Sequence, residues 1–138
     1  MRLSPQVPAC SSSSPPASRT VLITDDEPLM RQLVRRALAP LPYRLVEAAD
    51  GLEAIAVAQQ EQPALILLDL TMPQLDGWGV LRALQADPTL QAIPVVIVTG
   101  DAAVDEAMAV SAGAVGLIRK PFQIAPLRAT VQAVLGVA

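Results

Sequence analysis

Five short apolar runs recur along the chain, and most of them are followed by a segment of helical periodicity. The runs cover residues 20–24, 43–48, 64–69, 95–99 and 116–119. Most are near-continuous Val, Leu and Ile, which is typical of parallel strands buried on both faces. Their alternation with helices predicts an α/β fold, a doubly wound five-stranded parallel sheet with five helices.

The helical segments have start and stop signals. Pro28 is tolerated in a first helical turn, and the first helix is expected to end before Pro40. Asp50 and Glu53 have the spacing of a capping box, which predicts the start of the second helix. The other predicted starts are near Trp78 and Val104, with Gln123 as the cap of the last helix.

Helical spacing also predicts which apolar side chains face the sheet. The expected inward residues are Leu29, Leu33, Ala37 and Leu38 in the first helix, Leu52, Ile55 and Ala56 in the second, and Leu127, Val131, Val134 and Leu135 in the last.

The length of the chain fits one domain. It has 138 residues, of which 52% are hydrophobic, enough for a single core and too few for a second folded domain. Residues 1–18 are rich in Ser and Pro and predict a disordered tail. The folded domain is expected over residues 19–138, with no output module attached.

Charge and cysteine content exclude several classes of protein. The net charge is -3, and the arginines are scattered, so no basic stripe is present to bind nucleic acid. The single cysteine, Cys10, permits no disulfide within the chain. Pro and Ser stand near the N-terminus where a signal peptide would need an apolar segment, and no apolar run approaches the length of a membrane span. These features predict a cytoplasmic protein that binds neither nucleic acid nor membrane.

Polar residues gather where the predicted strands end. Asp25 and Asp26 follow the first strand, Asp69 ends the third, Thr99 ends the fourth and Lys120 follows the fifth. The carboxyl ends of parallel strands form the ligand crevice of a doubly wound sheet, so these side chains are expected to converge there.

The convergence of these residue types indicates phosphoryl chemistry. Three carboxylates repel one another unless a cation joins them, and an all-oxygen site suits Mg²⁺. An ammonium and a hydroxyl can hold the oxygens of a transferring phosphoryl group while Asp69 acts as the nucleophile. Among ten basic residues only Lys120 is a lysine, which favours a specific role for its ammonium.

Each residue also has a structural explanation. An aspartate at a strand end often caps a helix, a threonine there is a good β former, and one lysine can survive by chance in an arginine-rich sequence. The joint arrangement at successive strand ends favours a functional site.

Four runs together resemble the receiver domain of two-component response regulators. They are LITDDEP, LLDLTMPQLDGWGVL, IPVVIVTG and AGAVGLIRKPF, in the order and spacing of that family, within residues 19–138. The resemblance, closest to single-domain regulators of the chemotaxis type, implies a flavodoxin-like sheet of strand order 2-1-3-4-5. It implies a stand-alone receiver that accepts a phosphoryl group from a kinase phosphohistidine.

The resemblance assigns roles by position. Asp69 accepts the phosphoryl group, Asp26 holds Mg²⁺ directly and Asp25 through water, and the backbone carbonyl of Thr71 is a further ligand. Thr99 matches the switch hydroxyl and Lys120 the ammonium that pairs with the phosphoryl group. Pro121 resembles the cis proline of the family, and Met72, Pro73, Asp76 and Gly77 form a supporting turn.

One position departs from the family pattern. Many receivers have an aromatic residue three positions before the lysine, and Leu117 stands there. Leucine has no polar tip to exchange between solvent and core. Weaker communication is therefore expected between Asp69 and the surface formed by residues 104–114 and 116–134. Met108, Val110, Ala129 and Ala133 make that surface partly apolar, so a homodimer is one alternative.

The implied partners are a sensor histidine kinase or a histidine phosphotransfer protein, and an effector that the sequence does not name. The resemblance implies a signalling receiver that is not an enzyme but has intrinsic phosphoryl-transfer and autodephosphorylation chemistry. Two alternatives remain. An aspartate-nucleophile phosphohydrolase would need an acid where Thr71 stands, and a receiver that binds partners without phosphorylation would not need the complete Asp, Thr and Lys set.

Overall fold

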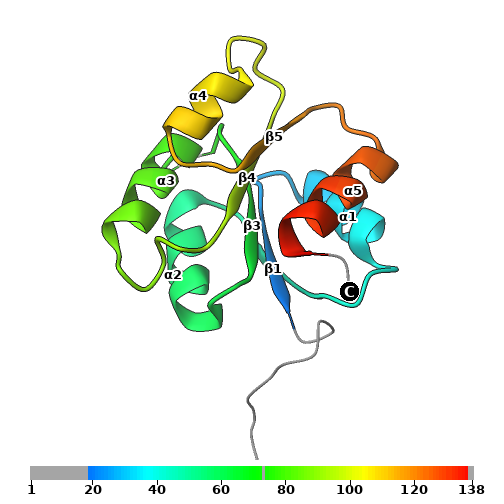
Figure 1. Cartoon of the computed structure of the whole chain (residues 1–138), viewed down its shortest axis with the longest axis horizontal. Helices are drawn as coiled ribbons and strands as arrows, with labels where there is room; N and C mark the ends of the chain where they lie inside the picture. The colour runs from blue at the N-terminus through cyan, green and yellow to red at the C-terminus, as the bar shows by residue number, and fades with distance from the viewer. Residues whose placement is uncertain (1–18, 73, 137–138) are drawn as a thin grey trace, which may run out of the picture.

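The computed structural model describes residues 19–72 and 74–136 (Figure 1). A single parallel sheet forms its centre, in the order β2-β1-β3-β4-β5. The strands are β1 (Thr20–Thr24), β2 (Arg44–Ala48), β3 (Leu65–Asp69), β4 (Val95–Thr99) and β5 (Gly116–Arg119). The predicted fold class and strand order are therefore confirmed. The predicted tail, Cys10 and Pro73 lie outside the described residues.

Helices cover both faces of the sheet. They are α1 (Pro28–Leu38), α2 (Gly51–Glu61), α3 (Gly77–Ala86), α4 (Glu106–Ser111) and α5 (Ile124–Leu135). Figure 1 shows α2, α3 and α4 on one side and α1 with α5 on the other. The strand connections therefore cross from one face to the other, as in a doubly wound sheet.

Each face of the sheet has its own apolar core. Alternate strand residues point to opposite faces, so Leu22 and Ile66 pack under α2, α3 and α4, whereas Val21 and Leu65 pack under α1 and α5. The three central strands, β1, β3 and β4, are buried along their whole length. This explains why their sequences are apolar runs without alternation.

The predicted inward faces of two helices are partly wrong. In α1, Leu29 is 68% exposed and Leu33 is 41% exposed, and the buried residues are Val34, Ala37 and Leu38. In α2, Leu52 is 57% exposed and Ala56 is exposed, whereas Gly51, Ala54 and Ala58 are buried. The small side chains of Ala54 and Ala58 face the sheet because they let the helix lie close to it. Gly51 meets a loop instead of the sheet, because a Cβ on it would lie 2.0 Å from the carbonyl oxygen of Leu75, between β3 and α3.

The predicted face of α5 is largely confirmed. Leu127, Val131 and Leu135 are buried, and Val134 is half-buried. Gln123 occupies the N-cap position, but its side chain makes no capping hydrogen bond.

The capping box of α2 is confirmed with one difference. The Glu53 amide donates to Asp50 Oδ1 at 2.8 Å, while the Glu53 carboxylate accepts from the amide of Ala49 at 2.6 Å instead of from Asp50. Replacing Asp50 by Ala is expected to lower the free energy of unfolding by about 1 kcal/mol, because a helix amide loses its acceptor. Urea unfolding measures this change.

Leu52 on the same helix provides the matched control. Because its side chain is mostly exposed, Leu52→Gln should change the free energy of unfolding by less than about 0.5 kcal/mol. A larger loss in Leu52→Gln than in Asp50→Ala would contradict the observed orientation of α2.

A groove opens between α3 and α4. It has a volume of about 580 Å³, and its lining includes Trp78 in the first turn of α3, Asp105 before α4 and Met108 on α4. Trp78 is half-buried and packs against the core under these helices. Met108 is 44% exposed.

Candidate functional site

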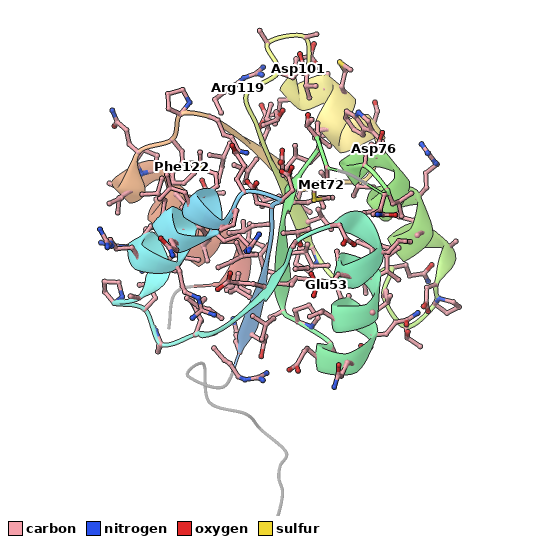
Figure 2. The ribbon with its side chains drawn as sticks, turned by 180° about the vertical axis from the view of Figure 1, so that it is seen from behind. Glu53, Met72, Asp76, Asp101, Arg119 and Phe122 are labelled. Carbon is pink, nitrogen blue, oxygen red and sulfur yellow. The ribbon has the colours of Figure 1, made fainter. Side chains whose placement is uncertain are left out.

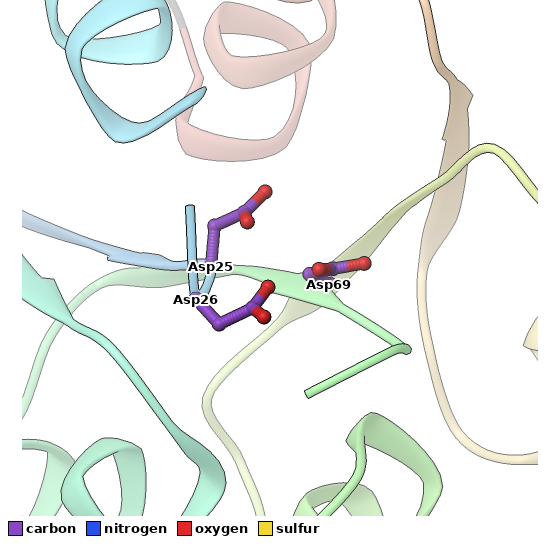
Figure 3. A group of neighbouring side chains, drawn as sticks. All are labelled: Asp25, Asp26 and Asp69. Carbon is purple, nitrogen blue, oxygen red and sulfur yellow. The ribbon is translucent and has the colours of Figure 1, made fainter. Parts of the chain in front are cut away.

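Three aspartates meet at the carboxyl edge of the sheet. Asp25 and Asp26 follow β1 and Asp69 is the last residue of β3, so adjacent parallel strands bring them together (Figure 3). One carboxylate oxygen of each lies within 4.8 Å of the others. Asp25 and Asp69 are buried and Asp26 is exposed. The sheet therefore juxtaposes the three carboxylates that the sequence singled out.

Lys120 extends into the same edge from the end of β5. Its Nζ donates to Asp25 Oδ2 at 2.8 Å and lies 3.6 Å from Asp69 Oδ2. The Lys120–Pro121 bond is cis, as predicted, and the Lys120 amide donates to the Thr99 carbonyl at 2.8 Å. The ammonium thus faces two of the three carboxylates.

Burial, together with the crowding of charge, changes the acidity of Asp69. Burial and the neighbouring Asp25 carboxylate raise the pKa of Asp69 to about 6, although Lys120 and the Thr71 amide oppose the change. Burial disfavours the charged Lys120, but its hydrogen bond to Asp25 and the negative charge around it raise the pKa of this ammonium. Lys120 is therefore a cation at neutral pH, within a surplus of negative charge.

Thr99 lies at the base of the site. It is the last residue of β4, only 1% exposed, and its Oγ1 accepts a hydrogen bond from the Asp101 amide at 3.1 Å. Thr71 lies two residues beyond Asp69, and its amide donates to Asp69 Oδ1 at 3.3 Å. All six predicted site residues, Asp25, Asp26, Asp69, Thr71, Thr99 and Lys120, are therefore at this edge of the sheet.

An open cleft of about 490 Å³ covers the site. Its lining residues are Asp26, Glu27, Asp69, Thr71, Gly100, Asp101 and Lys120. The sequence reasoning did not single out Glu27, Gly100 or Asp101. The positions of Glu27, next to Asp26, and Asp101, two residues beyond Thr99, were the available signal.

The turn after Asp69 supports the site, as predicted. Asp76 caps α3 by accepting from the Gly79 amide at 2.9 Å, and Met72 packs into the core. The Gly77 amide donates to the Leu70 carbonyl, and a Cβ on Gly77 would lie 2.6 Å from the Asp69 carbonyl oxygen. Glycine is needed here because α3 begins against the backbone of the phosphoryl-acceptor candidate.

The donor set fits a hard divalent cation. The cluster is made only of carboxylates, which are hard oxygen ligands, and two of them are buried beside a third that is open to solvent. An open cleft next to these oxygens leaves room for the water molecules that Mg²⁺ keeps. Carboxylates this close repel one another. In the described residues Lys120 is the one ammonium that faces Asp25 and Asp69, so a bound cation would supply the positive charge that the cluster lacks.

Comparison with known sequences identifies the family. The sequence model of the response regulator receiver domain matches residues 21–132. The chain belongs to the response regulator receiver family. Receivers are signalling modules of two-component systems. The probable transcriptional regulator ycf27 of Guillardia theta is 38% identical over 117 residues, which are 83% of this chain and 44% of that protein. This chain thus spans less than half the length of that relative.

Solved receivers have the same fold. The chemotaxis protein CheY4 of Vibrio cholerae is 31% identical, with a TM-score of 0.77, and the match covers 85% of this chain and 98% of that one. The receiver domain of a sensor histidine kinase from Pseudomonas aeruginosa is 28% identical, with a TM-score of 0.78, over 86% of this chain and 98% of that one. A magnesium ion is coordinated in the active site cleft of the latter structure.

One expectation from the sequence needs correction. The sequence led us to expect a protein that is not an enzyme but has intrinsic phosphoryl-transfer and autodephosphorylation chemistry. This expectation is wrong, because it denies catalysis and asserts it at the same time. The family match supports a simpler description, a receiver that acts as a signalling module.

No helix within residues 19–72 and 74–136 is long and apolar enough to cross a bilayer.

Proposed function

We propose that this receiver accepts a phosphoryl group onto Asp69 from the phosphohistidine of a sensor histidine kinase or histidine phosphotransfer protein. The observation that supports this best is the placement of Asp69. Its buried carboxylate lines the open cleft, with Lys120 Nζ 3.6 Å from one oxygen and the Thr71 amide 3.3 Å from the other. A nucleophile thus lies beside donors that can hold an incoming phosphoryl group.

In the proposed reaction an Asp69 oxygen attacks phosphorus. The bond between phosphorus and the histidine nitrogen breaks, and its electron pair stays on the imidazole. The raised pKa of Asp69 makes its carboxylate more basic than an ordinary aspartate, yet the group is mostly ionised above pH 7. The local environment therefore favours nucleophilic attack at neutral pH.

We propose Mg²⁺ as the metal of the acidic cluster. Asp26 and Asp69 would bind it directly, Asp25 through water, and the Thr71 carbonyl would be a further ligand. Bound Mg²⁺ would neutralise charge on the phosphoryl oxygens. The oxygen-only cluster supports this choice, as does the magnesium site of the related Pseudomonas aeruginosa receiver.

Thr99 and Lys120 have complementary proposed roles. The ammonium can bond a phosphoryl oxygen, since its present distance to Asp69 is short, and the Thr99 hydroxyl lies beside the cleft. Movement of Thr99 toward the phosphoryl group would switch contacts with an effector or precede relay to another protein. Weaker communication through Leu117, which is half-buried against the core under α4, stays a prediction.

Several features of the cell biology also remain proposals. We expect a cytoplasmic receiver that contacts neither nucleic acid nor membrane directly. Function without an attached output module stays a prediction, because the matched relatives are about twice as long as this chain. The homodimer is likewise open: Met108 and Val110 are exposed on α4, as are Ala129 and Ala133 on α5.

Intact-mass measurement tests the proposed function. Incubation with Mg²⁺ and acetyl phosphate should add one phosphoryl group, and Asp69→Asn or removal of Mg²⁺ should abolish the adduct. Asp76→Asn is the matched control: it removes a nearby carboxylate that only caps α3, and asparagine also caps helices, so the adduct should persist.

Failure of the wild-type protein to form the adduct with acetyl phosphate and with several histidine kinases would overturn the proposal in favour of a receiver that works without phosphorylation. Catalytic release of phosphate from added phosphomonoesters would favour the phosphohydrolase alternative.

A further inference from the structure

The backbone of Asp101 is held from both sides. Its amide donates to Thr99 Oγ1 at 3.1 Å, while its carbonyl accepts from Arg119 Nη1 at 2.8 Å and from the Val104 amide at 3.1 Å. The Asp101 side chain accepts from the Ala103 amide at 2.9 Å. The peptide groups on either side of Asp101 therefore have fixed orientations, one of which points an N–H at the Thr99 hydroxyl.

Arg119 provides the contact that comes from outside this loop. Thr99, Ala103 and Val104 all belong to β4 or to the β4–α4 loop, whereas Arg119 is the last residue of β5. Arg119 pairs with Thr99 in the sheet register, and Figure 2 shows Arg119 beside Asp101 at the top of the molecule. The bond is charge-assisted, because a guanidinium donates it.

This link lies one residue from the proposed site. Lys120 follows Arg119 and points into the cleft, and Asp101 itself lines the cleft. Leu117, at the usual aromatic position of β5, offers no polar tip to contact the loop. Arg119 therefore makes a polar connection between β5 and the loop of the Thr99 hydroxyl.

We propose that Arg119 is a positioning residue that holds the Asp101 peptide against the Thr99 hydroxyl and so opposes the turn of that hydroxyl toward Asp69. The inference rests on the proposed function, because the turn matters when Asp69 receives a phosphoryl group. To turn, Thr99 Oγ1 leaves the Asp101 amide. That amide can follow or find water only if the loop shifts, and the Arg119 bond to the Asp101 carbonyl resists the shift.

Arg119→Met removes the guanidinium but keeps a long apolar stem. In the unphosphorylated protein the Asp101 amide should exchange with solvent faster. Acetyl phosphate should also phosphorylate Asp69 about fivefold faster, because the lost charge-assisted hydrogen bond no longer opposes the shift of the loop. Arg82→Met is the matched control, since Arg82 is an exposed arginine on α3 and its loss changes the net charge equally. It should leave both rates unchanged.

A double-mutant cycle with Thr99→Val separates positioning from charge. Valine lacks the hydroxyl, so Arg119→Met should bring no acceleration in the Thr99→Val background. Equal acceleration in both backgrounds would show that Arg119 acts on the donor through its charge and would overturn the proposal. So would an unchanged or slower rate in the single variant.

Amide exchange keeps this test independent of phosphorylation. If wild-type Asp69 takes no phosphoryl group, the proposed function fails, yet exchange at Asp101 still measures whether Arg119 holds the loop. Unchanged exchange at Asp101 in Arg119→Met would refute the positioning role whether or not Asp69 is phosphorylated.

Discussion

Replacement of Lys120 by Met should slow phosphorylation of Asp69 by acetyl phosphate about 100-fold, because one preorganised donor to the phosphoryl oxygens is removed. Lys120 Nζ lies 3.6 Å from Asp69 Oδ2 and the side chain is half-buried, and methionine keeps most of its length without the ammonium. The initial rate of adduct formation, followed by intact mass at saturating Mg²⁺, gives the ratio.

Lys120→Arg distinguishes charge from shape. Arginine retains the cation but replaces a compact ammonium by a planar fork, so partial recovery of the rate is expected. Because Lys120 also pairs with Asp25, thermal unfolding must show that each variant is folded at the assay temperature. A folded Lys120→Met protein that is phosphorylated at the wild-type rate would exclude the proposed role of the ammonium.

Asp69→Asn should stabilise the metal-free protein at pH 7.5 by about 2 kcal/mol. When the pKa of a carboxyl is raised from its ordinary value to about 6 in the folded protein, its ionisation lowers the free energy of unfolding by roughly 3 kcal/mol. The asparagine amide removes that cost but solvates less well in the acidic cleft, which reduces the gain. Urea unfolding in the presence of a chelator measures the free energy.

The pH dependence has a definite sign. The folded protein binds the Asp69 proton more tightly than the unfolded chain, so wild-type stability falls, relative to the variant, as pH rises from about 4 to 6. The advantage of Asp69→Asn should therefore be absent below about pH 4, reach its full size above about pH 6, and shrink when Mg²⁺ is added. Carboxylates outside the cluster titrate alike in both proteins and cancel in the difference.

Asp76→Asn is again the control, since Asp76 is an exposed helix cap outside the cluster. Its stability difference from wild type should not follow the pH profile of Asp69→Asn. An Asp69→Asn protein that is less stable than wild type at pH 7.5 would show that Asp69 gains more from Lys120 and the Thr71 amide than it loses through burial and repulsion.

The sequence was sufficient to predict the strands because the buried parallel sheet leaves few alternatives. The first, fourth and fifth strands agree with the prediction residue for residue, and β2 and β3 begin one residue later than expected. Helix orientation was harder to predict. In α2 the close approach to the sheet selects Ala54 and Ala58, which a ranking by hydrophobicity places below Leu52.

The same contrast holds for the site. Asp69, Thr99 and Lys120 could be placed together because parallel strands end at one edge, whatever the loops do. The bond from Arg119 to the Asp101 carbonyl could not be predicted, because it joins an exposed side chain to the backbone of a separate loop. Neither hydrophobic period nor motif spacing contains that information.

The single tryptophan of the chain lies in the groove between α3 and α4. All indole fluorescence of the protein therefore originates at one junction, where Trp78 shares its surroundings with Asp105 and Met108 of the neighbouring segment. Its emission maximum and its quenching by acrylamide depend on how closely that segment covers the ring. The protein thus has a built-in optical probe of its own α3–α4 junction, which needs no label.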